Sequence, residues 1–210
     1  MHWIYRISNP VVRMLLFVLS RWRVEGKENV PCQGPILVVA NHMTMVDPPL
    51  LSVSLGRYAV FMGKEELFRS RLGGYFMSGL GVFPVRRGRI DRATLRLSER
   101  ILAAGHALAM FPEGVRSRNH KLQRAFPGSA VIALRTGVPI VPAAITGTET
   151  IGGLGWLRRP TLTVNFGRPF QLPPASGKAD RQASTDYIME RIAELLPPEY
   201  RGVYEAEEVG

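Results

Sequence analysis

Two short polar runs carry the side chains with which this chain could do chemistry. The first, Asn41-His42-Met43-Thr44-Met45-Val46-Asp47, contains a histidine followed five positions later by an aspartate. The second, Phe111-Pro112-Glu113-Gly114-Val115-Arg116-Ser117, contains a glutamate and an arginine. Because imidazole exchanges a proton near neutral pH, the first run could supply a general base. Because a guanidinium binds two oxygens at once, the second could hold a phosphorylated polyol.

The spacing of His42 and Asp47 decides where a helix can begin. Two residues five positions apart in one α-helix would lie about 140° apart around its axis, too far for direct contact. We therefore expect His42 on a turn and Asp47 in the first turn of the helix that follows. From there the carboxylate can accept a hydrogen bond from Nδ1–H, fix the tautomer and stabilise the imidazolium. Taken alone, the spacing also fits a histidine that merely caps or packs beside the helix.

Strand-like and helical segments alternate along the chain and must position both runs. Short apolar runs with flanking Gly, Pro or polar residues predict strands at 36–40, 58–62, 82–85, 107–111, 140–145 and 162–166. Capping residues and periodicity predict helices at 92–104, 129–136 and 185–196, and a polar loop at 176–183. This alternation predicts an α/β fold: one domain with a mainly parallel central sheet flanked by helices. Both polar runs would then follow strands, at the edge where open α/β sheets bind ligands.

The N-terminal segment carries interfacial residues. Its apolar stretch is interrupted by Arg6, Pro10 and Arg13, and its longest uninterrupted apolar run is far shorter than the roughly 20 residues that cross a bilayer. Tryptophan, tyrosine and arginine together are typical of helices that lie in the headgroup region of an anionic leaflet. We therefore divide the chain into a membrane-interfacial amphipathic helix at 1–23, a catalytic domain at 24–200 and an acidic tail at 201–210. The alternative is an amphipathic helix docked on the domain's own core.

Composition restricts the partners. The formal charge is +10, with 23 arginines and four lysines, which favours an anionic partner. Nucleic acid is disfavoured because the arginines are scattered and no nucleic-acid-binding signature accompanies them. The single Cys32 allows no intramolecular disulfide and fits a reducing compartment. His2, His106 and His120 show no ligand spacing, so we expect no metal and no cofactor.

Four blocks between about residues 20 and 170 resemble the bacterial 1-acylglycerol-3-phosphate acyltransferases, the His-x4-Asp glycerolipid acyltransferase superfamily. Two of the blocks are the polar runs. The others are Gly81-Val82-Phe83-Pro84-Val85-Arg86-Arg87 and Val138-Pro139-Ile140-Val141-Pro142. The resemblance implies His42 as base and Asp47 as its orienter, with the following substrate-binding residues: Lys64, Arg86, Arg87, Glu113, Gly114 and Arg116. An acidic residue commonly stands where this chain has Arg86, so either Arg86 or Arg87 could hold the phosphate. Many members also carry a lysine near the position of Pro127.

The resemblance implies an O-acyltransferase that moves a fatty acyl group from a thioester to the free hydroxyl of a lysophospholipid. The acceptor most typical of the family is 1-acyl-glycerol-3-phosphate, which gives phosphatidic acid. The acceptor hydroxyl would attack directly, so no serine or cysteine nucleophile is needed. The donor would be acyl-CoA or acyl carrier protein, and the protein would lie on the cytoplasmic face of the cell membrane, peripheral or monotopic, against an anionic surface.

Three alternatives stay open at this point. The four blocks also fit acylation of another lysolipid or of a glycolipid. A non-catalytic membrane-surface lipid-binding protein could keep the same fold, although binding alone gives no reason for a base and its orienter. A thioesterase or lipid hydrolase is disfavoured because the chain has no Gly-x-Ser-x-Gly nucleophile elbow.

Overall fold

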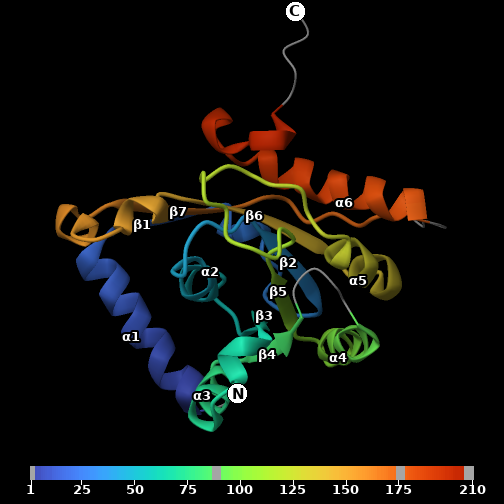
Figure 1. Ribbon diagram of the computed structural model, residues 1–210, viewed down its shortest axis with the longest axis horizontal. Helices are drawn as coiled ribbons and strands as arrows, with labels where there is room; N and C mark the ends of the chain where they lie inside the picture. Colours follow the sequence, from blue (N-terminus) through green and yellow to red (C-terminus); the bar gives the residue numbers. More distant parts are fainter. Residues whose placement is uncertain (1–2, 87–90, 174–177, 206–210) are drawn as a thin grey trace, which may run out of the picture.

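The computed structural model describes residues 3–86, 91–173 and 178–205, and it places a seven-stranded sheet between two layers of helices (Figure 1). The strand order is β1-β7-β6-β2-β5-β3-β4. Every neighbouring pair is parallel except β6 and β7. The strands are β1 Arg21–Glu25, β2 Ile36–Ala40, β3 Ala59–Lys64, β4 Val82–Val85, β5 Ala107–Met110, β6 Ile140–Thr146 and β7 Thr161–Phe166. The predicted α/β domain with a mainly parallel sheet is confirmed.

Helices lie on both faces of the sheet. Helices α1, α2 and α3 lie on one face, and α4, α5 and α6 lie on the other (Figure 1). They are α1 Trp3–Leu19, α2 Asp47–Ser54, α3 Arg71–Gly79, α4 Arg92–Ala103, α5 Gly128–Thr136 and α6 Lys178–Ala193. Short 3₁₀ helices lie in the connecting segments and after α6: η1 Lys27–Asn29, η2 Glu65–Phe68, η3 Thr148–Ile151, η4 Gly155–Arg158, η5 Pro198–Tyr200 and η6 Gly202–Tyr204.

The core consists of two apolar layers, one on each side of the sheet. Every residue of the central strands β2 and β5 is buried, as is typical of parallel strands covered on both faces. Alternate residues of β2 therefore enter different layers: Val38 packs with α2, and Leu37 with α5 and α6. This double burial explains why these strands are unbroken apolar runs in the sequence.

An edge strand replaces part of the predicted interfacial segment. Residues 21–23 belong to β1, which pairs in parallel with β7 from Arg21 opposite Thr161. The N-terminal helix ends at Leu19, so residues 21–23 of the expected interfacial segment are not helical. The interfacial role of the segment stays a prediction. The strand was missed because only Trp22 and Val24 pack against the core, while its other residues are charged and exposed.

Two C-terminal predictions also change. The loop expected at 176–183 is helical from Lys178 onward, and residues 176–177 lie outside the described residues. Residues 180–183 are exposed, so these turns of α6 need no apolar side chain. The expected tail at 201–210 begins with η6, where Gly202 and Val203 pack beside Leu122. Residues 206–210 lie outside the described residues.

Helix α1 has one face in the core and one in solvent. Ile4, Tyr5 and Leu16 are buried against the domain. The helix continues through Pro10, and large apolar side chains on its other sides are exposed, with Phe17 at 75%. Docking on the core and binding at a membrane interface are thus compatible, because different faces of α1 would make the two contacts. Within the described residues, no helix is both long and apolar enough to cross a membrane.

Candidate active site

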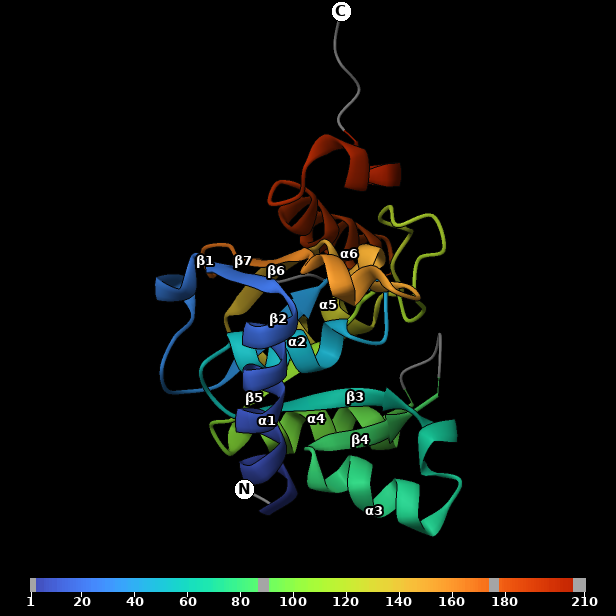
Figure 2. The same cartoon turned by 90° about the vertical axis from the view of Figure 1, so that its left-hand side faces the viewer.

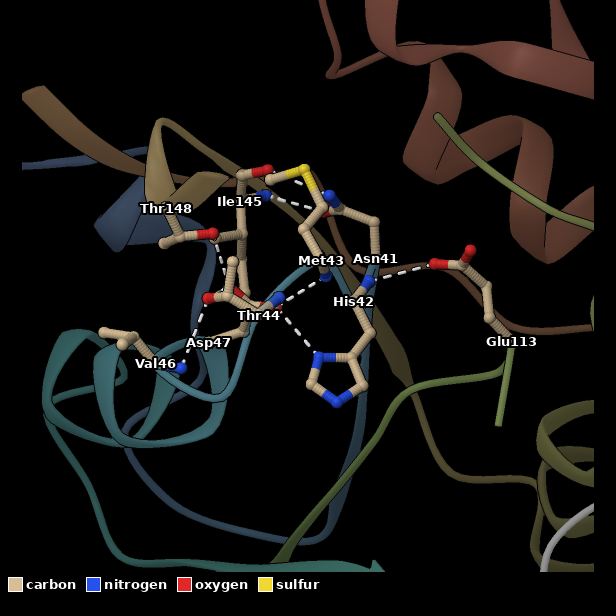
Figure 3. Close-up of polar contacts among 9 residues, drawn as sticks. All are labelled: Asn41, His42, Met43, Thr44, Val46, Asp47, Glu113, Ile145 and Thr148. Atoms are coloured by element: carbon tan, nitrogen blue, oxygen red, sulfur yellow. Dashed lines mark hydrogen bonds and ion pairs between the residues drawn. The ribbon is translucent and has the colours of Figure 1, made fainter. Parts of the chain in front are cut away.

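His42 and Asp47 meet at the carboxyl end of β2, where the chain turns into α2 (Figure 3). The imidazole Nδ1 lies 2.8 Å from Asp47 Oδ2. Helix α2 begins at Asp47 because two prolines follow, and proline suits a first turn in which backbone N–H groups have no intrahelical partner. His42 therefore stays on the turn before the helix. The expected contact between the two side chains is confirmed.

The Asp47 carboxylate is fully buried and collects hydrogen bonds from five donors. Oδ2 accepts from the backbone N–H groups of Met43 at 2.6 Å and Thr44 at 2.7 Å, as well as from the imidazole. Oδ1 accepts from the hydroxyls of Thr148 at 2.6 Å and Thr44 at 3.1 Å. These donors offset the cost of burying the carboxylate. An ionised carboxylate only accepts, so Nδ1 carries the imidazole proton and the Nε2 lone pair is available.

The second polar run holds the backbone of His42 in place. Glu113 Oε1 accepts from the His42 backbone N–H at 2.9 Å, and the Ser117 backbone N–H donates to the His42 carbonyl at 2.8 Å. The ring of Phe111 stacks on the imidazole, with centroids 4.2 Å apart. His42 is thus held by Asp47 through its side chain and by the second run through its backbone.

Glu113 is buried, and both of its carboxyl oxygens accept backbone hydrogen bonds. Glu113 is 1% exposed, and its Oε2 accepts a hydrogen bond from the Gln123 backbone N–H at 3.0 Å. Burial raises the pKa of Glu113 to about 7, although both backbone hydrogen bonds act in the opposite direction. Both oxygens are engaged below the surface, so in this structure Glu113 positions the backbone of His42. The contact with the acceptor that the resemblance implies stays a prediction.

The predicted cations follow neighbouring strands along the same edge of the sheet. Arg116 lies in the loop after β5, is exposed, and makes no ion pair or hydrogen bond with another described residue. Lys64, at the end of β3, is paired with Glu66 at 3.0 Å. Arg86, after β4, is paired with Glu65 at 3.2 Å.

Arg87 and Gly114 complete the set of residues that the resemblance predicts to bind substrate. Arg87 lies outside the described residues. Gly114 has φ +66°, a left-handed conformation that favours glycine, and a Cβ there would come within 3.0 Å of the Phe126 ring. Its backbone N–H donates to the Phe111 carbonyl at 3.0 Å, so its observed role is to form the turn that carries Glu113.

Two contributors to the site escaped the sequence prediction. Thr148 reaches Asp47 from η3, 101 positions along the chain, and spacing gives no signal for such a contact. Asn41 binds the backbone of Ile145 through both ends of its amide, at 2.7 and 2.9 Å, and so ties the end of β2 to β6. The position of Asn41 directly before His42 is the sequence signal that could have indicated this role. No group of three potential metal-ligating side chains gathers within the described part of the chain.

Comparison with known proteins identifies relatives of this arrangement. A family model described as Acyltransferase matches residues 21–146, which include both polar runs. The 1-acyl-sn-glycerol-3-phosphate acyltransferase of Bacillus subtilis is 26% identical over 91% of this chain and 96% of its own length. The enzyme of that name from Streptococcus pneumoniae is 28% identical, over 89% of this chain and 69% of its own.

A solved structure is also similar. The crystal structure of the 1-acyl-sn-glycerophosphate acyltransferase from Thermotoga maritima aligns with a TM-score of 0.67 and 28% identity. The alignment covers 87% of this chain and 75% of that one. The sheet and its helical layers are therefore shared with that protein.

The raised pKa of Glu113 predicts a pH-dependent stability. Because the folded protein retains a proton that the unfolded chain releases above pH 4.5, the contribution of Glu113 favours folding at low pH. As the pH rises from 4.5 toward 7, the contribution of Glu113 to the free energy of unfolding falls by about 3 kcal/mol in total. Urea unfolding of the wild type and Glu113→Gln between pH 4.5 and 8 measures it. The difference between their unfolding free energies should change across this range, whereas an exposed Glu25→Gln control should give a constant difference. A pH-independent difference for Glu113→Gln would contradict the assignment.

Proposed function

The chain belongs to the acyltransferase family, and from that premise we propose that it is a 1-acylglycerol-3-phosphate O-acyltransferase. It transfers a fatty acyl group from a thioester to the free hydroxyl of lysophosphatidate and gives phosphatidic acid. The observation that carries the proposal is the 2.8 Å contact between His42 and a fully buried Asp47. This contact leaves Nε2 of the imidazole available at the edge of the sheet, and Figure 3 shows the ring's second nitrogen pointing away from Asp47.

The geometry supports a direct transfer. His42 Nε2 accepts the proton of the acceptor hydroxyl as its oxygen attacks the thioester carbonyl. The C–S bond then breaks, and the imidazolium gives this proton to the departing thiolate, so the neutral imidazole is regenerated. Asp47 stabilises the imidazolium through Nδ1–H. The acceptor oxygen is the nucleophile throughout, and no acyl-enzyme forms.

The order of the strands favours Arg116 as the main phosphate ligand. His42 follows β2, and the loop with Arg116 follows β5, the next strand in the sheet. Strands β3 and β4 are the second and third from β2, or about 10 and 15 Å away at the usual strand spacing. The hydroxyl and the phosphate of the acceptor are on adjacent carbons of glycerol, so the nearest cation suits the phosphate. Lys64 and Arg86, each paired with a glutamate, would add longer-range attraction.

The remaining partners follow from charge and exposed surface. The net charge of +10 suits an acidic donor such as acyl-CoA or acyl carrier protein. The exposed apolar side of α1, with Arg6 and Arg13 also exposed, suits an anionic bilayer. We place the protein on the cytoplasmic face of the cell membrane, as a peripheral or monotopic protein.

A lipid mass-spectrometric assay tests the function and the base together. The wild type should acylate lysophosphatidate in preference to neutral lysolipids, with acyl-CoA or acyl carrier protein as donor. His42→Ala should lower kcat by at least about a hundredfold with an unchanged fold. Asp47→Asn should also lower kcat, because an amide cannot accept all five hydrogen bonds, and its thermal melt will show whether the turn is disturbed. Near-normal turnover by folded His42→Ala would exclude His42 as the base.

Arg116 should determine the affinity for a phosphorylated acceptor. Arg116→Lys retains the positive charge but loses the planar guanidinium, which binds phosphate through two hydrogen bonds. We expect a raised KM for lysophosphatidate and a smaller change for a neutral lysolipid. Arg118→Lys, an exposed residue in the same loop, is the matched control. Equal losses on both acceptors would show that Arg116 is not a phosphate ligand.

A further inference from the structure

Helix α3 exposes its apolar side chains. Leu72, Tyr75 and Phe76, at positions i, i+3 and i+4, are 80, 54 and 47% exposed. Gly73 and Gly74 lie on the side toward η2, where a Cβ at Gly73 would approach the Leu67 carbonyl within 3.0 Å. In a helix of a soluble domain, the apolar side ordinarily faces the core. The reversed orientation leaves a large part of each of these three apolar side chains exposed to solvent.

Helix α1 continues this surface. The indole Nε1 of Trp3 donates to the Tyr75 hydroxyl at 3.3 Å, and the N-terminal part of α1 lies beside α3 in both views (Figures 1 and 2). Large apolar side chains of α1 are exposed along its length, at 38 to 75%: Trp3, Ile7, Val11, Met14, Leu15, Phe17, Val18 and Leu19. Two segments far apart in the sequence thus form one apolar surface, larger than single scattered side chains would produce. We call it the α1–α3 surface.

The charges on the α1–α3 surface indicate which kind of partner it would bind. Neither helix contains an acidic residue. Arg6 and Arg13 of α1, together with Arg69 and Arg71 at the start of α3, are exposed. Exposed apolar and aromatic side chains flanked by arginine match the boundary between acyl chains and headgroups of an anionic leaflet. We propose that α3 is a second docking element that, with α1, seats the protein on an anionic phospholipid bilayer.

The position of α3 in the chain gives this docking a consequence for the site. Helix α3 joins β3, which ends at Lys64, to β4, which leads to Arg86. Seating α3 on the bilayer therefore brings the cation-bearing edge of the sheet close to the level of the headgroups, where the phosphate of a membrane-embedded acceptor lies. This step rests on the proposed function, whereas the docking itself is measurable without any turnover.

Fluorescent labelling tests whether α3 enters the bilayer. In a Cys32→Ser background, which removes the only cysteine, an environment-sensitive fluorophore is attached at Leu72→Cys or Val203→Cys. Val203 is 61% exposed and belongs to η6. In Figure 1 the segment that follows α6 lies at the opposite end of the molecule from α3. Vesicles of phosphatidylglycerol and phosphatidylcholine should raise and blue-shift the emission at position 72 and leave position 203 unchanged. No change at position 72 while the protein sediments with the vesicles would overturn the proposal.

A partition measurement supplies the second test. Leu72→Ser with Phe76→Ser should lower co-sedimentation with anionic vesicles by at least about fivefold, because both side chains lose apolar burial in the leaflet. Val203→Ser should match the wild type, and thermal melts should show that all variants are folded. Wild-type partitioning by the double variant would overturn the proposal. A wild type that self-associates in solution, together with a double variant that does not, would also overturn it, because the surface would then bind a second copy of the chain. Vesicle binding without acyl transfer would leave this inference intact and contradict only the proposed function.

Discussion

The buried carboxylate of Asp47 is the constraint on which the rest of the site depends. A negative charge with no exposed surface is stable only when donors surround it, and here they come from two parts of the chain. The turn after β2 supplies two backbone N–H groups and a hydroxyl, η3 supplies Thr148, and His42 supplies its ring. The orientation of the imidazole is therefore a consequence of satisfying the carboxylate.

The second polar run completes this arrangement from the neighbouring strand. Because β2 and β5 are parallel neighbours, the segments that follow them emerge side by side at one edge of the sheet. Glu113 and Ser117 then bind the two backbone polar groups of His42, while Arg116 of the same loop is exposed. One loop thus immobilises the backbone of His42 and carries an exposed cation. Under the proposed function, proton transfer and anion binding would therefore take place at the same edge of the sheet.

Sequence reasoning predicted the parts of the structure that have a local signal. The central strands are unbroken apolar runs, and the spacing of His42 and Asp47 excluded a shared helix, so the sheet and the contact were both predictable. Strand β1 and helix α3 lacked that signal, because one has a mostly charged sequence and the other contains three glycines and exposes its apolar side. The role of Thr148 and the burial of Glu113 depend on contacts between distant segments. No pattern within either polar run encodes them.

The tautomer of His42 is the most direct test of the account. Two-dimensional ¹H–¹⁵N spectra that detect the ring nitrogens, assigned with His42→Gln, would measure it at a pH where the imidazole is neutral. We expect a protonated Nδ1 that donates to Asp47 and an unprotonated Nε2 that can accept the proton of a hydroxyl. A neutral ring protonated mainly at Nε2 would contradict it, because that nitrogen could not then act as the base.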